Sequence, residues 1–67
     1  MRKYSLLDDE IKMLQLSKDD KIASEIAAIL DMKVAAVYRK LEIIKEKFNV
    51  DKIGQAVNKA DADGLLG

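Results

Sequence analysis

The chain has 67 residues, of which 49% are hydrophobic, and its 12 basic residues balance its 12 acidic ones. It contains neither Cys nor His, which excludes disulfides and the common zinc sites, so good helix packing or a partner chain must stabilise so small a domain. A formal net charge of zero is a poor match to strong non-specific DNA binding, which depends on Lys and Arg neutralising phosphates.

No apolar run approaches the length of a membrane span, and the N-terminal Met1-Arg2-Lys3 is followed by no long apolar segment of a signal peptide. We therefore expect a cytoplasmic protein with no membrane contact. The initial Met and the full set of helices favour a complete small protein over a domain excised from a longer regulator.

The chain has no Pro and only three Gly, and its apolar residues recur with the helical period rather than in strict alternation. These features predict an all-α fold of four helices. We expect an N-terminal arm at 1–5, a helical domain over 6–62 with helices at about 6–16, 21–30, 34–48 and 51–62, and a flexible tail at 63–67.

Each of the first two helices has an apolar stripe and a candidate cap at its start. The stripe of the first helix holds Leu7, Ile11 and Leu14, and Ser5 with Asp8 resembles a capping box. The stripe of the second helix consists of Ile22, Ile26 and Ile29, preceded by Asp19 or Asp20 as its cap.

The third helix is the longest and the only net-positive segment, with four basic and two acidic residues over 34–48. Asn49 can adopt the left-handed conformation that ends a helix. The apolar side chains lie within an arc of about 60° that must face the core. They are Val37, Leu41, Ile44 and Phe48.

The fourth helix, 51–62, begins with Asp51 as a candidate cap and contains Gly54 one turn in. Glycine there either weakens the helix or marks a close packing contact. The apolar stripe consists of Ile53, Ala56, Val57 and Ala60.

The acidic clusters do not indicate a catalytic or metal site. Residues 8–10 and 19–20 lie at helix starts, where carboxylates serve as caps, and no His or Cys accompanies them. Residues 61–64 echo a calcium loop, but Lys59 would occupy its first ligand position and no Glu follows. We expect a protein that is not an enzyme and that binds no cofactor or metal.

The paired helices at 21–48, joined by a turn at 31–33, fit two interpretations. One is a helix-turn-helix and the other an ordinary helical hairpin in a small bundle, and periodicity does not separate them. The apolar anchors of either would be Ile26, Leu30, Met32, Val37 and Leu41.

The order of motifs along the chain is more specific. Glu10-Ile11 precedes Leu14, Glu25-Ile26-Ala27 precedes Leu30, and Val37 is followed by Lys47-Phe48-Asn49-Val50 and Ala56-Val57. Over about residues 6–60 this order resembles the LuxR/GerE-type DNA-binding domain without a gap. The match is good in the core. It is poor where that family places Ser, Thr, Lys and His in its recognition helix, since this chain has Lys33, Ala36, Tyr38 and Lys40 there.

The resemblance implies a small sequence-specific transcriptional regulator that binds double-stranded DNA with its third helix in the major groove. It also implies a homodimer formed through the fourth helix. The residues expected at bases or in the groove are Val34, Ala35, Ala36, Tyr38 and Arg39; those expected at phosphates are Lys33, Lys40 and Lys47; those expected between subunits are Lys52, Gln55, Ala56 and Lys59.

A second hypothesis is a protein-binding module on the same fold, which would modulate a larger transcription regulator or a polymerase subunit without reading DNA. The neutral charge, Ile43 on an outer flank and the apolar pair Leu65-Leu66 favour it.

Overall fold

The computed structural model describes residues 5–66, and over these residues it consists of four helices without strands. They are α1 (Asp8–Lys18), α2 (Ala23–Leu30), α3 (Val34–Phe48) and α4 (Ile53–Ala62). The predicted all-α, four-helix fold is confirmed. Residues 1–4 of the predicted arm and Gly67 lie outside the described residues.

Every helix ends in the same way. One or two positions after its last residue comes a residue in the left-handed conformation, with φ between 55° and 74°. The next N–H then donates to the carbonyl five residues back, over 2.8 to 3.0 Å. Gly, Asn and Asp tolerate this conformation best, and the prediction for Asn49 is confirmed. The left-handed residues are Asp20, Asp31, Asn49 and Gly64.

Three helices also begin alike, but differently from the prediction. The side chain of the third helical residue accepts a hydrogen bond from the backbone N–H just before the helix, so the acceptor lies inside the helix. The pairs are Leu7 with Glu10 at 2.8 Å, Ile22 with Glu25 at 3.0 Å, and Lys52 with Gln55 at 3.1 Å.

These bonds explain why α1, α2 and α4 each begin two residues later than predicted. The predicted caps do not precede the helices directly, because the N-cap positions belong to Leu7, Ile22 and Lys52. The caps predicted at Ser5, Asp19 or Asp20, and Asp51 were therefore wrong. The start of α3 was predicted correctly, at Val34, and no side chain caps it.

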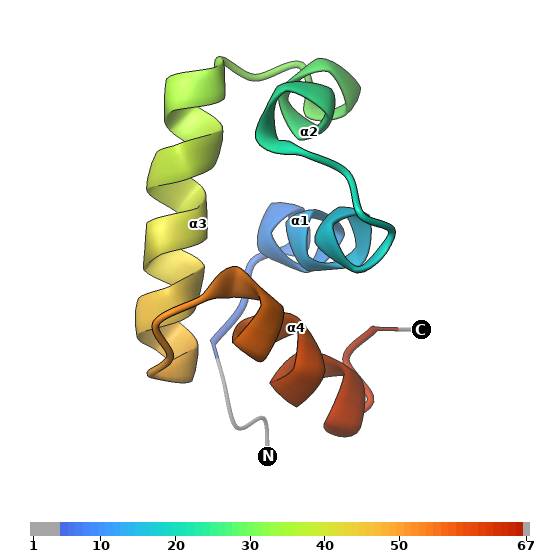
Figure 1. The fold of residues 1–67 in the computed structure, drawn as a ribbon, viewed down its shortest axis with the longest axis vertical. Coiled ribbons are helices and arrows are strands. Elements are labelled where there is room, and N and C mark those ends of the chain that lie inside the picture. The colour runs from blue at the N-terminus through green and yellow to red at the C-terminus, as the bar shows by residue number, and fades with distance from the viewer. Residues whose placement is uncertain (1–4, 67) are drawn as a thin grey trace.

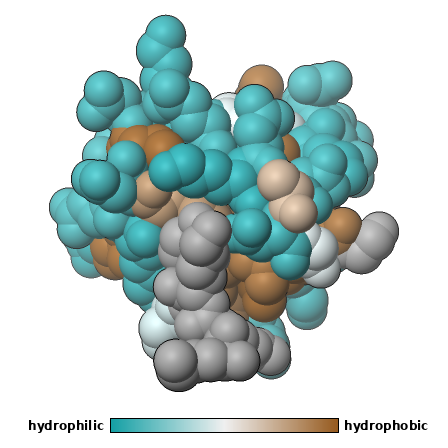
Figure 2. Space-filling model, turned by 90° about the horizontal axis from the view of Figure 1, so that it is seen from below, coloured by the Kyte–Doolittle hydropathy of each residue, from teal (hydrophilic) through white to brown (hydrophobic). Residues whose placement is uncertain are grey.

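The core forms around α1, which packs against all three other helices and lies at the centre of Figure 1. Its buried residues are Glu10, Met13 and Leu14, whereas the predicted stripe residue Leu7 is 55% exposed. The view in Figure 2 shows a mostly hydrophilic face on which hydrophobic side chains appear in separate places. The remaining buried apolar residues are Leu6, Ile26, Ala27, Val37, Ile44, Phe48, Ala56, Ala60 and Leu66.

The α2 helix lies at the edge of this core. It packs on α1 and α3 but not on α4, so one short stripe suffices to anchor it. Ile26 is buried, whereas Ile22 and Ile29 of the predicted stripe are 64% and 55% exposed. The inner face of α2 is formed by Ile26 and Ala27, with Ala23 and Leu30 partly buried, so it is turned around the helix from the predicted stripe.

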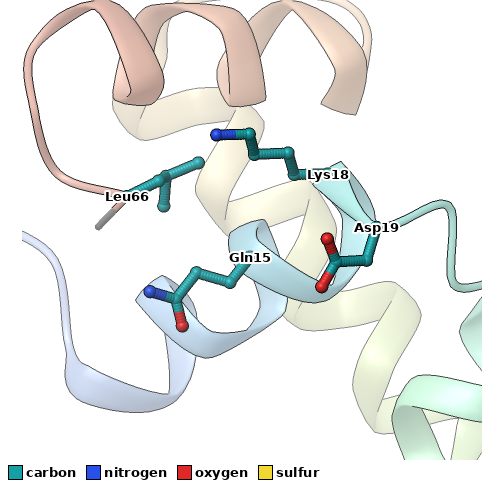
Figure 3. Close-up of a pocket in the computed structure, with 4 residues that line it drawn as sticks. All are labelled: Gln15, Lys18, Asp19 and Leu66. Atoms are coloured by element: carbon teal, nitrogen blue, oxygen red, sulfur yellow. The ribbon is translucent and has the colours of Figure 1, made fainter.

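The segment after α4, expected to be a flexible tail, returns to the core. Gly64 turns the chain, and Leu66 is only 6% exposed. Figure 3 shows Leu66 beside α1, where it lines a shallow hollow with Gln15, Lys18 and Asp19. Lys18 also pairs with Asp61 of α4, with 2.9 Å between Nζ and Oδ1. The end of the chain therefore helps to hold α4 against α1.

The burial of Leu66 gives a stability prediction. Leu66→Ala should lower the free energy of unfolding by about 2–3 kcal/mol, because it removes buried methyl groups and leaves a cavity. Urea denaturation followed by circular dichroism measures the loss. Ile29→Ala is the matched control, with an expected change within about 0.5 kcal/mol at an exposed site. Equal losses in the two variants would show that Leu66 adds nothing to the core.

Candidate nucleic-acid interface

The α2 and α3 helices pack together through a three-residue connection, residues 31–33, which is the connectivity of a helix-turn-helix. Asp31 is left-handed, and the N–H of Met32 donates to the carbonyl of Ala27 over 2.8 Å. Of the five predicted anchors, Ile26 and Val37 are buried, and the other three are partly buried against the core. The turn is therefore fixed by backbone hydrogen bonds and by apolar contacts.

The first half of α3 presents an exposed face. Figure 1 shows α3 along one side of the molecule, with α2 beside its N-terminal end and α4 near its C-terminal end. Tyr38 is 59% exposed and Val34 is 41% exposed. Ala35 and Arg39 are exposed as well, and Ala36 is partly buried. Four of the five residues predicted at bases or in the groove thus lie on the surface.

Charge is distributed unevenly along this helix. From Lys33 to Leu41 there are three basic residues and no acidic one, and the first acid of α3 is Glu42. Asp31, in the turn, is the nearest acid before this stretch. Within residues 5–66, the side chains of Lys33 and Arg39 form no ion pair or side-chain hydrogen bond. Both cations are therefore available to an external anion.

The other lysines of α3 are already paired. Lys40 Nζ lies 3.3 Å from Asp9 Oδ2 of α1. Lys47 Nζ donates to Glu10 Oε1 over 2.7 Å and to the carbonyl of Ser5 over 2.8 Å. In this structure two internal acceptors hold the Lys47 ammonium group, and its predicted contact with a phosphate stays a prediction.

Sequence reasoning missed the role of Glu10. Its side chain is 1% exposed, and its Oε1 accepts from both Leu7 N–H and Lys47 Nζ. A buried carboxylate needs such partners, since burying an unpaired charge is costly. One signal was present: Glu10 lies three and four positions before the apolar Met13 and Leu14, on the same face of a helix.

The predicted subunit surface on α4 is only partly exposed. Lys52, Gln55 and Lys59 lie on the surface, but Ala56 is fully buried in the monomer core, so the structure removes it from any such surface. Gln55 accepts from the backbone at the helix start, and Lys59 Nζ donates to the carbonyl of Phe48 over 3.2 Å. Lys52 is the lysine of this set whose ammonium group forms no hydrogen bond or ion pair with the described residues, neither with a side chain nor with the backbone.

Comparison of the chain with models of protein families, with curated proteins and with solved structures found no match. A functional assignment must therefore be argued from the geometry. No helix within residues 5–66 has both the length and the apolar character needed to cross a bilayer. The same residues bring together no group of three metal-binding side chains of the His, Cys, Asp and Glu types.

The Glu10–Lys47 pair gives a second stability prediction. Lys47→Met should lower the free energy of unfolding by about 2 kcal/mol, because it leaves the buried Glu10 carboxylate without its cation. The loss is moderate because the Lys47 side chain itself is partly exposed to solvent. Lys45→Met is the control, since Lys45 pairs with Glu42, whose side chain is 68% exposed. There we expect a loss within about 0.5 kcal/mol. Urea denaturation measures the free energy of unfolding of both variants. Equal losses would show that the Glu10–Lys47 pair contributes no more to stability than an exposed surface pair.

Proposed function

We propose that this chain is a small DNA-binding transcriptional regulator of the LuxR/GerE type, with α3 as the recognition helix. The observation that carries the proposal is the acid-free first half of α3, which follows a fixed turn, presents Arg39 and Lys40, and is preceded directly by Lys33. In helix-turn-helix proteins this part of the second helix enters the major groove. The uncapped start of α3 supports the same orientation, because free N–H groups at a helix N-terminus favour phosphate.

The side chains on the exposed face of α3 suit recognition of the major groove partly through the shape of the DNA. Val34 and Ala35 allow close approach and can contact thymine methyl groups, whereas Arg39 has the donors that guanine accepts. Tyr38 can donate its hydroxyl to a phosphate, as Lys33 can donate its ammonium group. Because few donors face the bases directly, specificity would depend on DNA deformability and on a second subunit.

The Arg39 contact can be tested directly. Arg39→Ala should weaken binding to a fluorescein-labelled duplex by about tenfold, the lower part of the range for a lost base contact. Fluorescence anisotropy at low salt measures the dissociation constant. Lys12→Ala is the matched control, because it removes one positive charge from an exposed position on α1 and should change affinity less than about twofold.

Two results would contradict this proposal in different ways. If the wild-type protein shows no affinity for duplex DNA, or an affinity that does not fall as salt rises, it does not bind DNA through phosphates. If Arg39→Ala and Lys12→Ala weaken binding equally, the binding surface lies away from α3. A duplex-selection assay on Arg39→Ala with Lys40→Ala separates sequence preference from total affinity.

We further propose that two chains pair through the exposed face of α4, which carries Lys52, Gln55 and Lys59. A dimer would place two recognition helices one DNA turn apart, as two half-sites require. Gly54 lies on this helix about 100° around from Gln55, and apart from its chain neighbours and the backbone of its own helix no atom lies within 4 Å of the place where its side chain would begin. A larger side chain at this position therefore has room in the monomer and would obstruct a partner.

Gly54→Gln tests this surface. It should leave the monomer as stable as the wild type, or more stable by up to about 1 kcal/mol, because glycine is a poor helix former. Sedimentation velocity with a palindromic duplex should show two wild-type chains per duplex and a weakened second binding step for the variant. Unchanged dimer formation would exclude an interface that covers Gly54, and a single wild-type chain per duplex would overturn the dimer.

A protein-binding module remains the second candidate. Exposed apolar side chains favour it, since Ile22, Ile29 and Ile43 are 64%, 55% and 37% exposed. The pair Leu65-Leu66 no longer supports it, because Leu66 is buried.

If the protein is such a protein-binding module, Ile29→Asp would abolish association with a transcription regulator or polymerase subunit and leave DNA affinity unchanged. Retention of nucleic acid alone from a cell extract would argue against this function.

A further inference from the structure

The first turn of α1 faces the basic flank of α3. Asp9 Oδ2 lies 3.3 Å from Lys40 Nζ, and Glu10 Oε1 lies 2.7 Å from Lys47 Nζ. The two lysines are similarly exposed, Lys47 at 30% and Lys40 at 28%, but the carboxylates differ: the Glu10 side chain is 1% exposed and that of Asp9 is 43% exposed. Exposed ion pairs are weak and exchange readily, while a buried pair is costly to open.

We propose that Asp9 is an internal competitor for DNA phosphate, which holds Lys40 in the free protein and limits its contribution to DNA affinity. This inference rests on the proposed function, because it requires α3 to face DNA. Lys40 lies one position after Arg39, within the acid-free first half of α3, so a duplex seated on this face comes within reach of its long side chain. Lys47 is not available in this way, since Glu10 and the Ser5 carbonyl both accept from it.

The competition acts on the sequence-independent part of binding. A lysine that neutralises a phosphate releases condensed counterions, and each such contact adds about 0.9 to the salt dependence of affinity. A lysine already neutralised by Asp9 releases fewer ions, or must first leave its carboxylate. Asp9 thus lowers the electrostatic affinity of a helix whose own charge favours DNA.

The chain offers a matched pair of variants, Asp9→Asn and Asp8→Asn. Both remove one acid from the first turn of α1, so they change the net charge and the interaction with the helix dipole alike. Asp8 is exposed and forms no ion pair with the described residues, so Asp8→Asn reports the general effect of a lost negative charge. Thermal unfolding by circular dichroism verifies that both variants fold.

The experiment measures affinity for one labelled duplex by fluorescence anisotropy between 50 and 200 mM salt. Relative to Asp8→Asn, we expect Asp9→Asn to bind more tightly at low salt and to show a plot of log affinity against log salt that is steeper by about 0.9. Over that fourfold range of salt, the extra slope corresponds to about a 3.5-fold change in affinity. In a Lys40→Ala background, the difference between the two variants should vanish.

The outcomes separate this inference from the function on which it rests. Equal affinities and slopes for the two variants would overturn the role of Asp9 while leaving DNA binding intact. A gain for Asp9→Asn that persists in the Lys40→Ala background would also overturn it, because the effect would not act through Lys40. Absence of binding by every protein at low salt would overturn the DNA-binding function itself, and this inference with it.

Discussion

The packing of α3 against the other three helices determines which side of α3 is free. Val37, Ile44 and Phe48 are fully or almost fully buried, and they repeat at spacings that place them on one side of the helix. Helical geometry then directs Arg39 and Ala35 to the opposite side. Because the chain has no Cys or His for a disulfide or a zinc site, this apolar packing is also a main source of stability. The same residues therefore hold the fold together and orient the candidate interface.

Local sequence signals predicted the helix ends better than the helix starts. An end needs a residue that tolerates the left-handed conformation, and Asp, Asn or Gly occupies all four such positions. A helix start can be capped by a side chain before the helix or by the side chain of its third residue. The sequence around α1 offers both possibilities: Ser5 with Asp8 fits the first, and Leu7 with Glu10 fits the second. The second pattern prevails there because Lys47, 37 residues away, stabilises Glu10 inside the core. Periodicity in one helix cannot reveal such a partner.

The same distinction applies to the candidate interface. The exposure of Tyr38 and Arg39 follows from the period of α3 alone, so it could be predicted from the sequence. The pairing of Lys40 with Asp9, and the burial of Ala56 and Leu66, depend on how α1 and α4 approach the remaining helices. Two lysines of α3 that look equivalent in the sequence, Lys40 and Lys47, consequently differ in how firmly they are held.

A net charge of zero is compatible with this interface because charges act over short distances. At physiological ionic strength an exposed charge is largely screened beyond about 8 Å, so a phosphate near Arg39 responds to its neighbours rather than to the whole chain. The acids of this protein are concentrated at α1, at the helix ends and in the second half of α3, and the first half of α3 has none. A neutral chain lacks long-range attraction to DNA, and in our proposal the pairing of Asp9 with Lys40 also weakens the local attraction between α3 and phosphate. A protein built in this way would hold poorly to arbitrary DNA and would depend on a close fit of α3 in the groove.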